Sequence, residues 1–331
     1  MAYPVWMDVD TGVDDAIAII VAHGLKELDI LGISAVCGNA SLENTFRNTK
    51  ALNVICGSSC PVFKGAERPL FREPIHAEEV HGKNGLGDVE IPVSEEEEIH
   101  KEGTGDDPFL QRSQGDIKPP FEGAAWDALY KAACRHPREL CVIATGPLTD
   151  LALAFFKYPE LPGLLNKILI MGGSVSEGNT TPCAEFNIYA DPEAAQAVFK
   201  SGVPIVLCPL DVTERVYLTE EDMEEIKGYG SRAGQFVYDI LRKPWSFHKT
   251  LGYPGVQIHD SCPVLYLYRP ELFTAKEAGV YVETKGTVTV GKTVTDLYSD
   301  RKFDKRNAVV ALDTDAGECV RIIKECIKKL P

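Results

Sequence analysis

The chain has 331 residues, 44% of them hydrophobic and 25% charged, which is the composition of a folded globular protein with one large domain or two modest ones. Its formal net charge of −15 argues against binding to nucleic acid or to an anionic membrane, because both need a basic face. No segment is long and apolar enough to cross a bilayer, and the chain enters a core strand too early for a cleavable signal.

The first elements are predicted to be a buried strand over residues 3–9, a turn at Thr11-Gly12 and a helix over residues 14–25. Further strands are expected at residues 29–36, 61–63, 140–144, 167–171, 204–208, 280–284, 287–290 and 308–312. Further helices are expected at residues 42–55, 122–134, 148–156, 192–200, 220–228, 232–243 and 315–329. This alternation predicts a single α/β domain, residues 1–331, with a mostly parallel central sheet and helices on both faces.

Aspartates crowd the junction of the first strand and helix, in the segment Asp8-Val-Asp10-Thr-Gly-Val-Asp14-Asp15. Carboxylates a few ångströms apart repel one another, and a hard divalent cation removes that cost. Oxygen ligands favour Ca²⁺ or Mg²⁺ over zinc, and open α/β sheets bind ligands at the carboxyl ends of their strands. The alternative, that the last two acids only favour the positive end of the helix dipole, does not account for Asp8 and Asp10.

Residues 94–117 carry many acids and glycines but few large apolar side chains, so we expect an acidic surface insertion there. Most of the ten cysteines, such as Cys37, Cys141 and Cys208, lie in apolar surroundings. We interpret them as buried free thiols in a reducing compartment, which predicts a cytoplasmic protein.

Two later strands are also followed by polar groups. Thr145 directly follows the strand at 140–144, and its carbonyl would point outward at the same edge of the sheet as the acidic turn. A backbone oxygen is a good calcium ligand. A Gly-rich loop after Met171 leads to Asn179, Glu185 and Asn187, whose amides and carboxylate suit the vicinal hydroxyls of a sugar. The loop contains no Lys or Arg and no phosphate-binding motif, which argues against a phosphate cradle.

Near the end of the chain, His259 and Asp260 lie side by side at the start of a predicted helix. Each has a purely structural interpretation, Asp260 as a helix cap and His259 as a core histidine, and a functional one in company with the first cluster. Loops at Asn39 and at His81 could also reach the site, the second as a lid.

Taken together and in this order, these motifs resemble the nucleoside hydrolases of the inosine-uridine preferring type, which cleave the N-glycosidic bond of ribonucleosides. The resemblance covers nearly the whole chain and rests on the acidic turn, Gly38-Asn39, His81-Gly, Thr145-Gly-Pro-Leu-Thr, Met171-Gly-Gly, Glu185-Phe-Asn187 and His259-Asp260. The turn departs from the family pattern at Thr11, where proline is usual. The preferred base is left open.

The resemblance implies a Ca²⁺ cofactor and a nucleoside substrate in a homo-oligomer, a dimer or tetramer. It implies metal ligands at Asp10, Asp15, the Thr145 carbonyl and Asp260. Asp10 would take the proton of a water that the ion activates, and His259 would protonate the leaving base. The expected ribose contacts and neighbouring groups are Asp14, Asn39, His81, Met171, Asn179, Glu185 and Asn187.

Two other functions remain possible from the residues. Asp8-x-Asp10-Thr11 after an apolar strand fits the nucleophile motif of haloacid-dehalogenase-type phosphatases, with Asp8 attacked by phosphate. However, later strand ends lack the Lys and acidic pair which that chemistry needs. A non-catalytic, calcium-dependent riboside-binding protein is the other alternative.

Overall fold

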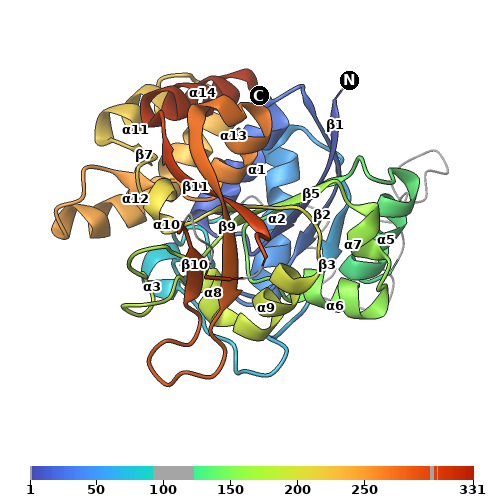
Figure 1. Cartoon of the computed structure of the whole chain (residues 1–331). Coiled ribbons are helices and arrows are strands. Elements are labelled where there is room, and N and C mark those ends of the chain that lie inside the picture. The colour runs from blue at the N-terminus through green and yellow to red at the C-terminus, as the bar shows by residue number, and fades with distance from the viewer. Residues whose placement is uncertain (1, 92–122, 299–301, 304) are drawn as a thin grey trace.

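The computed structural model of the chain, shown in Figure 1, describes residues 2–91, 123–298, 302–303 and 305–331. The acidic insertion predicted at residues 94–117 lies outside the described residues. The single domain over residues 1–331 stays a prediction.

The predicted α/β architecture is confirmed. A nine-stranded sheet has the order β10-β9-β11-β6-β5-β4-β1-β2-β3. All neighbouring pairs from β11 to β3 are parallel, whereas β9 pairs antiparallel with both β11 and β10. The strands are β1 (Tyr3–Val9), β2 (Leu28–Ala35), β3 (Val62–Lys64), β4 (Cys141–Ala144), β5 (Lys167–Met171), β6 (Ile205–Cys208), β9 (Phe273–Val282), β10 (Thr293–Asp296) and β11 (Ala308–Thr314). A separate two-stranded sheet pairs β7 (Tyr217–Leu218) with β8 (Val256–Gln257).

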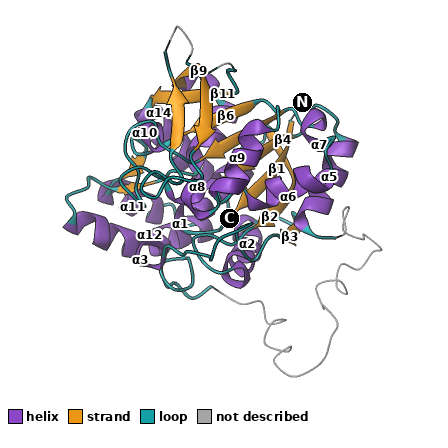
Figure 2. Cartoon of the chain, turned by 60° about the horizontal axis from the view of Figure 1, so that its bottom comes forward, coloured by secondary structure: helices purple, strands orange, loops and turns teal. Residues whose placement is uncertain are grey.

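Helices lie on either side of the strands, as Figure 2 shows. The longer ones are α1 (Val13–Gly24), α2 (Leu42–Cys56), α5 (Ala125–Arg135), α6 (Thr149–Lys157), α9 (Pro192–Lys200), α11 (Glu220–Lys227), α12 (Arg232–Thr250), α13 (Ser261–Tyr268) and α14 (Ala316–Lys329). The short ones are α3 (Glu78–His81), α7 (Leu161–Leu164), α8 (Phe186–Ala190), α10 (Leu210–Thr213) and η3 (Pro270–Leu272). No described helix is long and apolar enough to cross a bilayer.

The pleat of the strands divides the core into two layers. In β1, Val5 and Met7 face the layer formed by α1, α2 and α11 to α14, whereas Trp6 faces the layer formed by α5, α6, α7 and α9. Both layers are apolar because β1, β4 and β5 are hydrophobic on both faces, as expected for buried parallel strands. The strands are thereby fixed from both sides, and their carboxyl ends are held in register.

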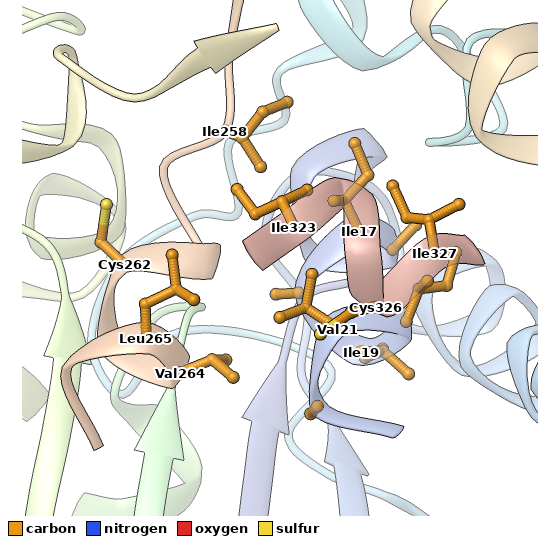
Figure 3. Packing of buried hydrophobic residues seen from close by; sticks show 14 of the residues in the cluster. Ile17, Ile19, Val21, Ile258, Cys262, Val264, Leu265, Ile323, Cys326 and Ile327 are labelled. Carbon is orange, nitrogen blue, oxygen red and sulfur yellow. The ribbon is translucent and has the colours of Figure 1, made fainter. Parts of the chain in front are cut away.

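Helix α1 packs against both α13 and α14 in the first layer (Figure 3). Ile17 and Val21 of α1 belong to the same buried cluster as Leu265 of α13 and Ile323 of α14. A Cβ on Gly24 would lie 2.8 Å from the Cα of Cys326, so α1 and α14 make a close backbone approach that requires glycine. This packing fixes the helix whose first turn carries Asp14 and Asp15.

The strand order 3-2-1-4-5-6 places a topological switch point between β1 and β4. Chain connections leave the sheet in opposite directions there, and open α/β sheets bind their ligands beside the carboxyl ends of such a pair of strands. Asp10 directly follows β1 and Thr145 directly follows β4. The switch point therefore lies where the sequence places its first candidate ligands.

Three predicted elements differ in the structure. The strand expected at residues 280–284 is part of the longer β9, which begins at Phe273. Residues 287–290, predicted to be a strand, form a turn closed by a hydrogen bond of 2.7 Å from Gly291 N to Glu283 O, and the strand that follows is β10. Helix α12 was expected to end at residue 243 but continues through Pro244, which is buried. Proline costs a helix about 3 kcal/mol, and here the burial of one face of a 19-residue helix outweighs that cost.

Candidate functional site: a buried acidic centre

The acidic turn between β1 and α1 folds back on its own helix. Gly12 N donates a hydrogen bond of 2.9 Å to Asp15 Oδ2 at the start of α1, where the helix dipole favours negative charge. A Cβ at Gly12 would lie 2.6 Å from His81 Nδ1 and 2.7 Å from Asn39 Nδ2. The turn therefore needs glycine because two other candidate residues lie against its backbone.

Three carboxylates converge at this point. Asp14 and Asp15 from α1 and Asp260 from the start of α13 each offer an oxygen, and these atoms lie within 4.8 Å of one another. Asp15 and Asp260 are buried, and the side chain of Asp14 is 14% exposed. Acids that are far apart in the sequence are thus brought together at the switch point of the sheet.

Asp10 lies beside these three carboxylates, close enough for its charge to raise the pKa of Asp260. It is fully buried, and Asn39 N donates a hydrogen bond of 2.7 Å to its Oδ2. Within the described part of the chain, its Oδ1 has no hydrogen-bond partner, and neither has the Oδ1 of Asp14. Asn39 Nδ2 donates to Asp15 Oδ2 at 3.1 Å, so the backbone and side chain of one residue orient two of the acids. Buried acceptors without donors are costly unless a ligand satisfies them.

The electrostatics of the four acids point the same way. Burial and then the charge of Asp15 raise the pKa of Asp10 well above its usual range, and burial and then the charges of Asp14, Asp15 and Asp10 do the same for the pKa of Asp260. Burial raises the pKa of Asp15 to about 6, and Asp14 adds to this shift. Such a set is unfavourable when ionised by itself, and a bound divalent cation reverses that balance. The oxygen-only donor set fits a hard cation.

Thr145 lies in this centre, but with a role for its hydroxyl that the sequence did not indicate. Its Oγ1 donates a hydrogen bond of 2.7 Å to Asp15 Oδ1. Its carbonyl accepts from Asn187 Nδ2 at 2.6 Å, and the same Nδ2 lies 3.2 Å from the carbonyl of Met171. A carbonyl oxygen has two lone pairs, so one of them stays available for a cation.

Glu185 and Asn187 lie beside the acidic centre, next to Thr145. Glu185 caps α8 and accepts from the backbone N–H groups of Asn187 (2.8 Å), Gly173 (2.7 Å) and Ile188 (3.1 Å). Burial nevertheless raises the pKa of Glu185 to about 7. Asn179 is exposed on the same loop, and its Oδ1 accepts from Phe186 N at 3.0 Å.

Two histidines face the acids. Val13 N donates to His81 Nδ1 at 3.0 Å, and this nitrogen lies 3.9 Å from Asp14 Oδ1. Burial lowers the pKa of His81 to about 4, so the ring is neutral at pH 7 and carries its proton on Nε2. His259 Nδ1 lies 2.8 Å from Thr213 Oγ1, and burial lowers the pKa of His259 although Asp14 opposes this. Thr213 was not predicted; its place shortly after β6, at the carboxyl end of a parallel strand, was the available signal.

Asp8 has different neighbours from the other three acids of the turn. Its carboxyl accepts a short hydrogen bond from Ser34 Oγ, and burial raises its pKa to about 7 beside the buried carboxyl of Asp150. Asp150 in turn accepts from Ala66 N at 2.6 Å. Asp8 therefore joins β1 to β2 and α6, and its carboxyl interacts with Ser34 and Asp150, whereas the charge of Asp10 acts on Asp260.

A family model for the inosine-uridine preferring nucleoside hydrolases matches residues 5–321. The chain belongs to this family. The chain is similar to the pyrimidine-specific ribonucleoside hydrolase RihA of Escherichia coli (strain K12). The two are 37% identical over 331 residues, and the match covers 99% of each protein. A purine-preferring ribonucleoside hydrolase from Gardnerella vaginalis is 28% identical, with a TM-score of 0.86 over 98% of both chains. The plant nucleoside hydrolase PpNRh1 is 27% identical, with a TM-score of 0.85 over 99% of both chains.

The predicted activity is thereby confirmed. The protein is a metal-dependent nucleoside hydrolase that splits ribonucleosides into ribose and free base. The Asp cluster could bind the metal. Family membership decides against the phosphatase and against the non-catalytic binding protein, and the contacts of Asp8 with Ser34 and Asp150 give it a structural place instead.

Proposed function

We propose that this nucleoside hydrolase holds Ca²⁺ with Asp10, Asp15, the Thr145 carbonyl and Asp260, and that Asp10 is the general base. The observation that carries the proposal is the convergence of Asp14, Asp15 and Asp260, together with the buried Oδ1 of Asp10, which has no hydrogen-bond partner among the described residues. When bound, calcium would bind sugar hydroxyls and make a water molecule more acidic. Asp10 takes a proton from the attacking water, and its fixed contact with Asn39 N holds the carboxylate for this step.

The ribose lies between the acids and the loop that follows β5. Its hydroxyls exchange hydrogen bonds with Asp14, Asn179, Glu185 and Asn187. Three further residues lie next to these groups: Asn39, Met171 and His81. Cleavage makes the sugar positive, and the carboxylates beneath it stabilise that charge in the transition state. Attack from the face opposite the base predicts inversion at the anomeric carbon, by analogy with inverting glycosidases.

His259 is proposed as the acid that protonates the leaving base. Its hydrogen bond with Thr213 supports this role, because in the protonated ring Nδ1–H donates to Thr213 Oγ1, and the Nε2 proton is the one left to pass to the base. Burial lowers the pKa of the ring, which makes its protonated form a stronger acid toward the departing base.

The leaving group tests this assignment. His259→Ala should slow hydrolysis of inosine about 10²-fold or more, the contribution of a typical general acid, but p-nitrophenyl riboside far less, since nitrophenolate leaves without a proton. Single-turnover rates on both substrates measure the difference. His136→Ala, at the end of α5, is the matched control. Equal losses on the two substrates would show that His259 only shapes the pocket.

We further propose a preference for pyrimidine ribonucleosides. The support is that pyrimidine-specific relatives are 37% identical to this chain, against 28% for the purine-preferring structure. We expect kcat/KM for uridine or cytidine to exceed that for inosine by at least about tenfold, a discrimination that pocket contacts can supply. Steady-state rates by base release decide it, and faster cleavage of inosine would refute the preference. The homo-oligomer, dimer or tetramer, and the cytoplasmic location remain predictions, which light scattering and cell fractionation would test.

A further inference from the structure

The Gly-rich loop after β5 is held by a lysine from a distant part of the chain. The ammonium group of Lys292, directly before β10, donates to the carbonyls of Ser174 (3.1 Å), Val175 (3.0 Å) and Ser176 (2.7 Å), and lies 3.3 Å from Ser174 Oγ. An ammonium has three donors, and here all of them are directed at one short backbone segment.

The opposite side of the same segment meets a carboxylate. Asp211 of α10 accepts from Val175 N at 2.6 Å and from Ser176 N at 3.0 Å. The carbonyls of the loop therefore face a positive group and its amides a negative one. Charge-assisted hydrogen bonds of this kind are about twice as strong as neutral ones, so the conformation of the loop is fixed by two side chains that do not belong to it.

The loop segment held by Lys292 and Asp211, which together we call the clamp, is connected to Glu185 by hydrogen bonds. Thr293 Oγ1 donates to Ser174 O at 2.8 Å and accepts from Ser174 N at 2.9 Å. A Cβ on Gly173 would lie 2.6 Å from Thr293 Oγ1, so the backbone of Gly173 is packed against that side chain. Gly173 N in turn donates to Glu185 Oε2 at 2.7 Å. A shift of the loop would move the donor that orients this carboxylate.

We propose that Lys292 is a positioning residue for ribose recognition, acting with Thr293 through the loop backbone on Glu185. The proposal rests on the proposed contact between Glu185 and a ribose hydroxyl. It assigns the hairpin at the edge of the sheet a part in catalysis, although Lys292 itself does not touch the substrate. Lys292 is only partly exposed, and burial lowers the pKa of its ammonium group, so protein atoms replace much of the solvent around it.

The test compares ribose with sugars that lack one hydroxyl. Lys292→Met, which keeps the length of the side chain and removes its charge, should lower kcat/KM for uridine about tenfold or more, since small displacements in an active site cost up to about 10²-fold. The penalty for 2′-, 3′- or 5′-deoxyuridine relative to uridine should shrink for at least one of the three. A residue that only stabilises the fold would leave all three ratios unchanged, and that result would overturn the proposal.

Two further variants keep the outcome clear. Lys285→Met, on the exposed turn of the same hairpin, is the matched control and should behave as wild type. Thr293→Val keeps its shape, removes the two hydrogen bonds to Ser174, and should shrink the same ratio; it decides the question should Lys292→Met fail to fold. Glu185→Gln distinguishes a failure of the proposed ribose contact from a failure of the proposed clamp. No change of ratio in that variant refutes the ribose contact, whereas a change there without one in Lys292→Met refutes only the clamp.

Discussion

Asp10→Asn is expected to lower kcat by at least about 10³-fold while the protein stays folded. Asn39 N donates to Asp10 Oδ2, and an amide side chain would direct its oxygen to that donor. The NH₂ group would then occupy the place of the unpartnered Oδ1, where it cannot accept a proton. Single-turnover hydrolysis of uridine measures the rate, and far-ultraviolet circular dichroism with thermal unfolding verifies the fold.

Asp313→Asn is the control for this substitution. It changes an exposed acid at the carboxyl end of β11, in the same sheet, whose carboxylate forms an ion pair with Arg215 at 3.2 Å. The control should retain wild-type activity. An unchanged rate constant in Asp10→Asn would remove Asp10 as the base, even if it remained a metal ligand.

Asp260→Asn should change stability in opposite directions with and without calcium. In excess chelator the buried acids repel one another, so removing one charge should raise the unfolding temperature by a few degrees, since about 1 kcal/mol corresponds to about 2–4 °C in larger domains. In calcium at about 100 times its Kd, the wild type gains about 2.7 kcal/mol by binding, and the variant, with one ligand fewer, gains less. The order of the two proteins should therefore invert.

Calorimetric unfolding in chelator, in calcium and in magnesium provides the measurement. Asp315→Asn, which keeps a side-chain oxygen to cap α14 away from the acidic centre, serves as the control and should change stability little in all three solutions. Parallel curves for wild type and Asp260→Asn in every solution would contradict a cation site at Asp260. A shift in magnesium as large as that in calcium would contradict the choice of Ca²⁺.

The sheet and its helices were predictable because their sequence signals are local. Strands such as Lys167–Met171 are short apolar runs between turn residues, and their alternation with helices determines a parallel sheet. The carboxyl ends of such strands must lie at one edge, so the pattern of strands predicts that Asp10 and Thr145 lie at the same edge, and the strand order then makes them neighbours. The β-branched run at residues 287–290 misled because its flanking glycines favour a turn.

Other parts of the site depend on contacts that no local pattern encodes. Asp8 lies only two positions before Asp10 in the same acidic segment, yet its carboxyl contacts Ser34 and Asp150 instead of the acidic centre. The clamp on the Gly-rich loop joins residues more than a hundred positions apart. Nothing in the sequence around Lys292 distinguishes it from an exposed surface lysine, because its partners are backbone carbonyls.

The close packing of α1 against α14 has a consequence for synthesis of the enzyme. Translation produces α1 long before it produces α13 and α14. Until those two helices leave the ribosome, the apolar side of α1 lacks neighbours that cover it in the finished protein, so a nascent chain is exposed to aggregation for much of its elongation. In the proposed cation site, capture of the ion by the acids at the start of α1 would accordingly wait for Asp260, which arrives with α13.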